Sequence, residues 1–255
     1  MVRGGVAVGT AGQAPRLPPA KVRERVFLEE ENVRALEELL GEMGAGSLLL
    51  VGGMGVRALV GGWASHGRYT LDVDAVARVG LDRVAGAAES LGFSVERREW
   101  GLELARASTV SRRYAVKVDV GVPAVASPRG RVFRYEPDMY VVADLEAATG
   151  YVAHGVHVQR VEVLMLGKMA SGTPKVPHDL VDLIAVDRAW RSGRLAIERE
   201  LVRAKLEEGD AHLDVREFLE KLRAAPMGPF EELRKAALST VFVKLVGSLL
   251  EELDA

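Results

Sequence analysis

The spacing of apolar residues divides the chain into a tail, a mixed region and a helical region. Residues 1–20 are rich in Gly, Ala and Pro without a sustained period, which is typical of an extended arm. Over residues 21–43 apolar positions return at helical spacing, with charged residues on the other faces. Beyond residue 161 the helical pattern continues almost to the end, with a break at "APMGPF". Two long helical stretches therefore enclose a region of a different kind.

Short β-type runs alternate with turn residues in that middle region. "SLLLVGG" is typical of a buried strand ending at a glycine pair, and "MGVRALVGGW" of a short helix. A helix is also expected over residues 81–91. Further strands are expected in "RYTLDVDAV", "FSVERRE", "LELARAS", "YAVKVDVGV" and "RVFRYE". We therefore predict an α+β fold with a mixed β-sheet flanked by helices over residues 21–160, followed by a C-terminal helical domain over residues 161–255.

The run "RYTLDVDAV" carries two carboxylates on one face of an expected strand. Successive strand side chains point to opposite faces, so Arg68, Thr70, Asp72 and Asp74 share a polar face. Two like charges on one face repel each other unless a cation lies between them. A solvated edge strand with an ordinary polar face would show the same pattern, so both interpretations stay open at this point.

A second strand repeats the feature. In "YAVKVDV", Lys117 and Asp119 share the polar face, and valines occupy the other. If this strand lies beside the first, Asp72, Asp74 and Asp119 converge on one point. Three carboxylates form an oxygen-rich site that suits Mg²⁺ or Mn²⁺, which bind through a few carboxylates together with substrate phosphates.

The glycine pair Gly52–Gly53 follows an expected strand and begins an expected helix. Backbone N–H groups at such a turn are free to bind a phosphate, although Gly-Gly at a tight turn is often only a turn. The second pair, Gly61–Gly62, competes for this role. We favour Gly52–Gly53, because it follows an apolar strand directly.

The blocks "LLLVGGMGVRALVGG", "RYTLDVD" and "VKVDV" resemble the nucleotidyltransferase superfamily related to DNA polymerase β, and within it the minimal and AbiEii-type toxin-like members. The similarity continues in "VQRVEVLMLGKMASGTPKVPHDLVDLIAV", where such proteins carry a glutamate, a helical lysine and Asp-Leu-x-Asp-Leu. Glu162, Lys168, Asp179 and Asp182 occupy these places. The resemblance spans roughly residues 47–187 and implies a nucleotidyltransferase fold.

The resemblance also implies roles for individual residues. Asp72, Asp74 and Asp119 would be the catalytic residues that hold Mg²⁺ or Mn²⁺. The residues implied to bind the nucleotide are Gly52, Gly53, Arg68, Thr70, Lys168, Asp179 and Asp182. Simpler alternatives remain for three of them: Lys168 can extend over an apolar face to water, Asp179 can cap a helix, and Asp182 can favour the helix dipole.

Composition limits the classes of protein. With 48% hydrophobic residues among 255, the chain can bury a sizeable core, and it contains no apolar run long enough to span a membrane. We expect a cytoplasmic protein without a membrane partner. The absence of cysteine excludes disulfides and thiolate metal sites. One asparagine and two glutamines beside 27% charged residues predict a thermophilic source.

The net charge of −2 gives no general argument for binding nucleic acid. A local basic stretch, from Arg97 through Arg112 and Arg113 to Lys117, is either a surface for a polyanion or a solvated strand face. We expect transfer of a nucleoside monophosphate from an NTP to an acceptor. By resemblance, the acceptor is an RNA end or a protein hydroxyl, and an antitoxin-like partner is implied. The alternative is a protein that keeps the fold and binds a nucleotide or a partner without turnover, but the complete set of carboxylates counts against it.

Overall fold

The structure, a computed structural model, describes residues 19–61, 68–126, 132–134, 140–146, 152–224 and 227–254. Most of the expected N-terminal arm and Gly62 lie outside the described residues. Pro19 and Ala20, which we assigned to the arm, already belong to the first helix, α1 (Pro19–Met43). Proline is well accommodated in the first turn of a helix, because the N–H group it lacks would have no partner there.

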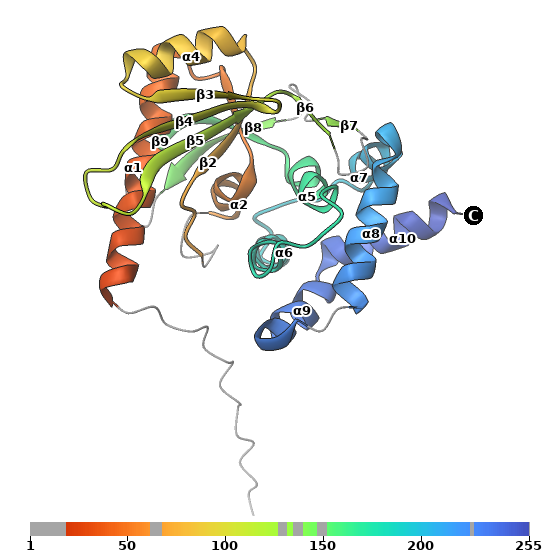
Figure 1. The fold of residues 1–255 in the computed structure, drawn as a ribbon. Coiled ribbons are helices and arrows are strands. Elements are labelled where there is room, and N and C mark those ends of the chain that lie inside the picture. Colours follow the sequence, from red (N-terminus) through yellow and green to blue (C-terminus); the bar gives the residue numbers. More distant parts are fainter. Residues whose placement is uncertain are drawn as a thin grey trace, which may run out of the picture.

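A seven-stranded mixed sheet forms the centre of the first part of the chain (Figure 1). Its strands are β1 (Leu48–Leu50), β2 (Val73–Ala77), β3 (Ser94–Arg98), β4 (Gly101–Ala107), β5 (Ala115–Gly121), β8 (Tyr140–Glu146) and β9 (Val152–Gln159). Their order is β3-β4-β5-β2-β1-β9-β8. The pairs β2–β5 and β1–β9 are parallel and the others antiparallel. Two short strands, β6 (Ala124–Ala126) and β7 (Val132–Arg134), pair separately.

Helices α1, α2 (Gly52–Val60) and α4 (Leu81–Ser90) pack against the sheet. Valines at alternate positions of β5 are buried, which leaves Lys117 and Asp119 on the opposite face as the sequence predicts. The buried face joins α1 and α4 in one hydrophobic core. Met54 of α2 belongs to the same core.

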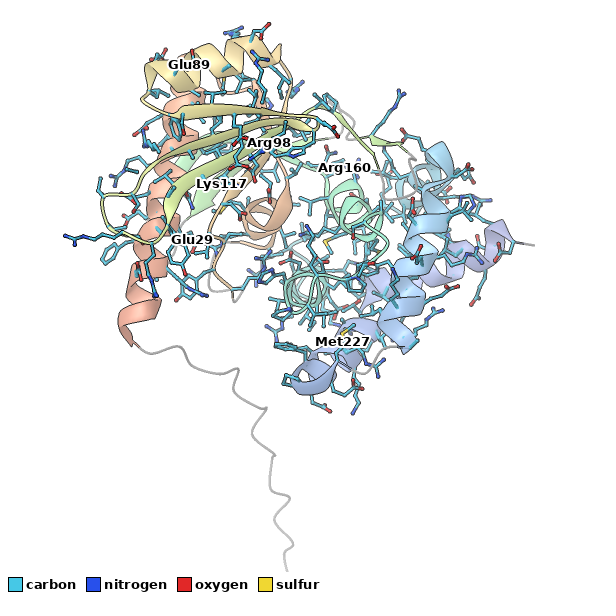
Figure 2. All side chains as sticks on the ribbon, in the orientation of Figure 1. Glu29, Glu89, Arg98, Lys117, Arg160 and Met227 are labelled. Carbon is cyan, nitrogen blue, oxygen red and sulfur yellow. The ribbon has the colours of Figure 1, made fainter. Side chains whose placement is uncertain are left out.

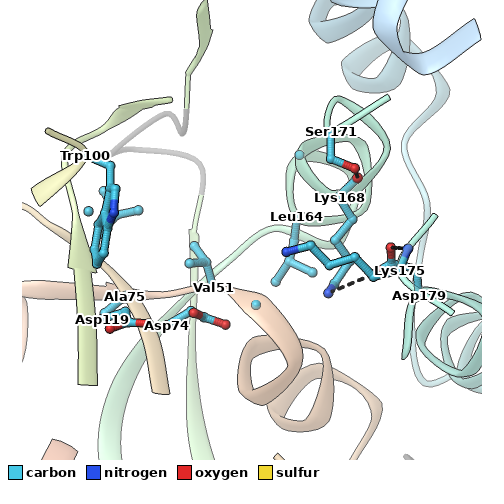
Figure 3. Close-up of a pocket in the computed structure, with 14 residues that line it drawn as sticks. Val51, Asp74, Ala75, Trp100, Asp119, Leu164, Lys168, Ser171, Lys175 and Asp179 are labelled. Carbon is cyan, nitrogen blue, oxygen red and sulfur yellow. Dashed lines mark hydrogen bonds and ion pairs between the residues drawn. The ribbon is translucent and has the colours of Figure 1, made fainter. Parts of the chain in front are cut away.

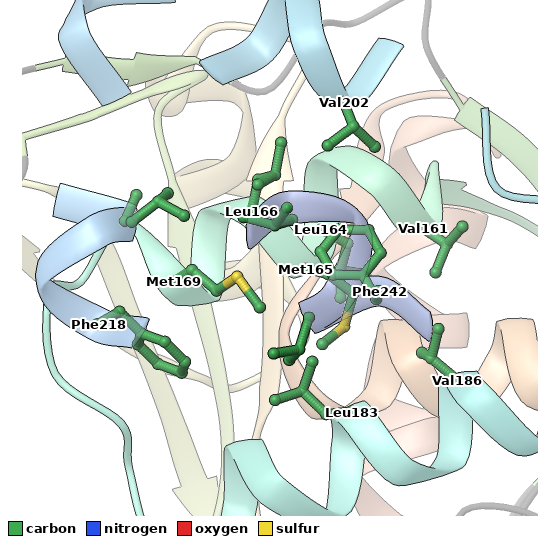
Figure 4. Packing of buried hydrophobic residues seen from close by; sticks show 14 of the residues in the cluster. Val161, Leu164, Met165, Leu166, Met169, Leu183, Val186, Val202, Phe218 and Phe242 are labelled. Atoms are coloured by element: carbon green, nitrogen blue, oxygen red, sulfur yellow. The ribbon is translucent and has the colours of Figure 1, made fainter. Parts of the chain in front are cut away.

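The remaining helices pack around a second core. They are α5 (Val161–Met169), α6 (His178–Arg191), α7 (Arg199–Glu207), α8 (Ala211–Ala224), α9 (Glu231–Leu238) and α10 (Val241–Leu253), with 3-10 turns at Glu208–Asp210 and Gly228–Phe230. Met169, Phe218 and Phe242 are among its buried residues (Figure 4). Val56 and Val60 of α2 belong to this core too, so α2 joins the sheet layer to the helical layer.

The α+β architecture with a mixed sheet and C-terminal helices is confirmed. One strand was predicted too long: β2 begins at Val73, and the preceding residues from Arg68 are not in the sheet. The side chains of Arg68 and Thr70 instead form hydrogen bonds with Asp182 on α6 and Glu29 on α1, so these contacts with helices hold the segment before β2. Strands β6, β8 and β9 were not predicted. Within the described residues, the helices are too short or too polar to cross a bilayer.

Candidate active site

Three carboxylates converge where β2 and β5 lie side by side. The parallel register places Asp74 opposite Asp119, and Asp72 immediately precedes β2. One oxygen from each of these three side chains lies within 4.8 Å of the other two. The predicted convergence is therefore confirmed, and it follows from the parallel register of β2 and β5, which pairs Asp74 with Asp119.

Burial and mutual repulsion make this cluster costly to ionise. Burial, and then the charge of Asp72, raises the pKa of Asp74 to about 6. Burial also raises the pKa of Asp119, although the hydrogen bond from Lys117 acts in the opposite direction. Among the described residues, Oδ1 of Asp119 is buried and has no hydrogen-bond partner. Such a cluster is electrostatically suited to a bound cation.

Lys117 supplies part of the missing positive charge. Its side chain is labelled in Figure 2, and its Nζ lies 3.0 Å from Oδ2 of Asp119 and 3.7 Å from Oε2 of Glu103, which pair in the β4–β5 register. The lysine is partly exposed, so water weakens these ion pairs. It touches only Asp119 of the three carboxylates, which leaves Asp72 and Asp74 without comparable compensation from it.

The first turn of α2 touches the carboxylates. Gly52 has φ +62°, and a Cβ atom there would lie 2.0 Å from Oδ2 of Asp74. A Cβ atom on Gly53 would lie 2.2 Å from Nη2 of Arg68 and 2.7 Å from Cγ2 of Thr70. The Gly52 position therefore requires glycine, whereas a side chain at Gly53 would have to displace Arg68 and Thr70. Gly61, by contrast, ends α2 in the left-handed conformation, a structural use at the other end of the helix.

Four predicted nucleotide-binding residues form one ion-pair network. Asp182 on α6 is fully buried and accepts two hydrogen bonds from Arg68, at 2.9 and 3.0 Å. Nζ of Lys168 on α5 lies 2.9 Å from Oδ2 of Asp182 and 3.6 Å from Oδ1 of Asp179. Asp179 does not cap its helix: its carboxylate accepts a hydrogen bond from the backbone N–H of Lys175 at 2.7 Å.

Two other residues named by the motif lie outside this network. Thr70 is 3% exposed and donates to Oε1 of Glu29 on α1 at 3.1 Å. Glu29 also pairs with the buried Arg57 of α2, whose guanidinium donates to the backbone carbonyl of Arg68. Thr70 therefore holds the segment before β2 in place. Glu162 is buried and accepts a hydrogen bond from the N–H of Glu198 at 2.7 Å.

A cavity of about 400 Å³ lies between the carboxylates and the helical layer. Its wall includes Gly52, Asp74, Trp100, Asp119, Lys168 and Lys175. Figure 3 shows Lys168, Ser171 and Lys175 on one side and Trp100 on the other, with Asp74 between them and Asp119 below Trp100. The cavity thus has a cationic side, an acidic floor and an aromatic side.

The wall also contains an aromatic and two polar residues that were not predicted: Trp100, Ser171 and Lys175. Trp100 belongs to the two-residue turn between β3 and β4, where a large aromatic ring is not a typical turn residue. A tryptophan in such a tight turn was therefore a signal, readable in the sequence, that this residue has a role outside the turn. Ser171 and Lys175 lie in the connection between α5 and α6, where no periodic pattern marks a position.

The basic stretch at residues 97–117 is largely paired with carboxylates. Arg97 pairs with Asp82, Arg98 with Glu96 and Glu103, and Arg106 with Glu38. Arg112 and Arg113 are exposed. Most of the stretch is therefore a strand face with compensated charge rather than a continuous positive surface.

Comparisons with known proteins give a limited result. No family model and no curated protein matches the chain. Among solved structures, it is similar to an antigenic nucleotidyltransferase-like protein from Paracoccidioides brasiliensis, at 16% sequence identity and a TM-score of 0.39. The similarity covers 88% of this chain and 93% of that chain. A likeness at this level carries no argument about activity, which therefore rests on the geometry of the site.

Proposed function

We propose that the protein is a Mg²⁺-dependent nucleotidyltransferase that moves a nucleoside monophosphate from an NTP to an acceptor hydroxyl. The observation that carries the proposal is the convergence of Asp72, Asp74 and Asp119 at a cavity that Asp74 and Asp119 line and that also has a cationic side. Carboxylates and cations placed face to face across one cavity suit a ligand that is a polyphosphate held through divalent metal.

The donor set fits Mg²⁺ or Mn²⁺. All three side chains offer hard oxygen ligands, one of these oxygens is buried without a hydrogen bond, and the cluster carries more negative charge than Lys117 compensates. Asp72, Asp74 and Asp119 would hold the metal. When bound, the metal supplies a lowered pKa for the acceptor hydroxyl and charge compensation for the leaving pyrophosphate.

The rest of the chain would bind and orient the triphosphate. Lys168 and Lys175 lie on the cationic side of the cavity. Gly52 and Gly53 form the N-terminus of α2 beside Asp74, and their backbone N–H groups would bind a phosphate. The acceptor oxygen forms a bond to the α-phosphorus, and the bond from that phosphorus to the bridging oxygen of the β-phosphate breaks. Pyrophosphate leaves with the electron pair, and the hydroxyl proton passes to solvent.

The acceptor belongs to the proposal as well. The family resemblance favours an RNA end or a protein hydroxyl, with an antitoxin-like protein as a partner. The paired charges of residues 97–117 reduce the support for a broad polyanion surface there. A compact acceptor group that enters the cavity is therefore better supported than a long duplex lying on the sheet.

A transfer assay tests the proposal. Each of four α-labelled NTPs is incubated with Mg²⁺, the protein and a cell extract, and the label is followed into RNA and into protein. We expect label in one of these fractions with wild type and none with Asp74→Asn. Asp82→Asn is the matched control, because Asp82 is an exposed carboxylate in the first turn of α4 and does not belong to the cluster. Equal labelling by Asp74→Asn and wild type would contradict the proposal.

A further inference from the structure

An exposed tryptophan on the acceptor side of the cavity is not used by the chemistry described above. Trp100 is 41% exposed and lines the cavity that holds Asp74 and Asp119. Its side chain comes from the β3–β4 turn, which contains only Glu99 and Trp100. Tight two-residue turns favour Gly, Asn or Asp, so an aromatic ring at this place is not explained by the turn itself.

The backbone around Trp100 is fixed against the neighbouring strand. Its carbonyl accepts a hydrogen bond from the N–H of Val122 at 3.2 Å. The next residue, Gly101, lies so close to β5 that a Cβ atom there would stand 2.1 Å from the carbonyl oxygen of Val120. The turn therefore has a defined position at the end of β5, two residues beyond Asp119, and the indole is presented on a rigid support.

The direction of the reaction assigns this side of the cavity. In phosphoryl transfer, the attacking and leaving oxygens lie roughly in line with the phosphorus. The leaving pyrophosphate would face Lys168 and Lys175, so the acceptor would approach from the opposite side, where Trp100 lies (Figure 3). The nucleoside of the NTP is attached to the α-phosphorus through a third oxygen outside that line. It would therefore extend away from both the lysines and Trp100.

We propose that Trp100 is a stacking platform for a nucleobase of the acceptor, with the acceptor hydroxyl presented near Asp119. This inference rests on the proposed function and adds a binding subsite to it. Gly101 pairs with Gly121, so the turn lies about 7 Å along the strand from Asp119 at the usual rise per residue. In a nucleoside the ribose separates the hydroxyl from the base, so a base stacked on Trp100 leaves the hydroxyl near Asp119. The hydroxyl of a tyrosine is attached directly to its ring, so a tyrosine ring stacked on Trp100 would keep its hydroxyl close to the indole.

Tryptophan fluorescence tests the subsite directly. The chain has tryptophans at 63, 100 and 190, so a variant with Trp63→Phe and Trp190→Phe reports on Trp100 alone. Uridine, adenosine, a short oligoribonucleotide and N-acetyltyrosinamide are titrated with and without Mg²⁺ and a non-hydrolysable NTP analogue. We expect saturable quenching by the nucleosides or the oligoribonucleotide and no quenching by the analogue alone. Tighter binding of the oligoribonucleotide assigns the nucleobase to an RNA end, and equal binding assigns it to a free nucleoside.

Calorimetry of nucleoside binding to the protein that keeps Trp63 and Trp190 gives a second measurement. Trp100→Ala should weaken nucleoside binding by roughly 5- to 100-fold, the range expected for loss of one base–aromatic stack, and Trp100→Phe should recover much of it. The affinity for Mg²⁺-NTP should not change in either variant. Trp190→Ala is the control, because Trp190 is similarly exposed on α6 but does not line the cavity.

Three results would overturn the inference. Quenching by the NTP analogue, with loss of NTP affinity in Trp100→Ala, would assign Trp100 to the base of the donor. Quenching by N-acetyltyrosinamide but not by nucleosides would assign a protein acceptor. No response to any probe would remove the subsite. Failure of the proposed function has a different signature, because Mg²⁺-NTP would then fail to bind in wild type and in every Trp100 variant.

Discussion

A Cβ atom on Gly52 would lie 2.0 Å from Oδ2 of Asp74, so the first turn of α2 is in direct contact with the carboxylate cluster. The turn that would bind a phosphate is therefore also packed against one proposed metal ligand.

Gly52→Ala should remove nucleotide binding and lower stability. The substitution places a methyl group on Asp74 and requires φ +62° from a residue with a Cβ atom, which costs about 1–2 kcal/mol before the clash is counted. Gly86→Ala on α4 is the control, because nothing lies within 4 Å of its Cβ position. That change should raise the free energy of unfolding by about 0.5–1 kcal/mol. Urea unfolding and NTP calorimetry measure both effects, and normal NTP binding by Gly52→Ala would show that this turn does not contact the nucleotide.

Asp74→Asn should stabilise the metal-free protein at neutral pH. The pKa of Asp74 is about 6 in the fold against an ordinary 3.8, so between these values the folded state holds more protons than the unfolded state. The free energy of unfolding of wild type therefore falls as the pH rises from 4 to 7, by about 3 kcal/mol for a shift of about two units. The asparagine variant lacks this dependence.

Urea unfolding in EDTA across this pH range measures the difference. The variant should exceed wild type above pH 7, and the two should agree near pH 4. Mg²⁺ together with NTP should then stabilise wild type but not the variant, because a ligand selective for the folded state raises its stability only where it binds. A variant less stable than wild type at pH 7.5 without metal would contradict the claim that ionised Asp74 destabilises the metal-free fold.

Asp182→Asn should lower stability more than any exposed carboxylate does. Asp182 is fully buried and pairs with both Arg68 and Lys168, so the substitution leaves two cations close together. We expect a loss of about 3 kcal/mol, the usual scale for breaking a buried pair. Asp82→Asn, which removes an exposed pair with Arg97, should change stability by less than about 1 kcal/mol. Thermal melts with NTP should show partial recovery of Asp182→Asn, because the triphosphate supplies negative charge to the same cations.

The three carboxylates could be predicted because strand parity is a local property. Asp72 and Asp74 alternate with apolar residues, and Asp119 interrupts a valine strand in the same way, so each residue shows its face in the sequence. That the two strands are neighbours was a hypothesis until the structure placed Asp74 opposite Asp119. The sequence carries no local signal for the order of strands in a sheet.

Other parts of the site depend on contacts between distant residues. Arg68 and Asp182 are 114 residues apart, and each by itself has an ordinary use, in a strand face and at a helix start. Thr70 belongs to the block "RYTLDVD" together with Asp72 and Asp74, yet it bonds to Glu29 on α1 and does not line the cavity. The strand β9 was missed because its pattern of valines and histidines does not alternate cleanly, although it lies in the sheet between β1 and β8.

Isothermal calorimetry of NTP binding, with and without Mg²⁺, tests the central claim most directly, because it needs no knowledge of the acceptor. Wild type should bind one of the four NTPs in the presence of Mg²⁺ and bind it far more weakly in EDTA. Asp119→Asn and Asp74→Asn should lose the effect of Mg²⁺, and Asp82→Asn should keep it. Equal affinity of wild type for every NTP with and without Mg²⁺ would contradict the claim that these three aspartates form a metal-dependent nucleotide site.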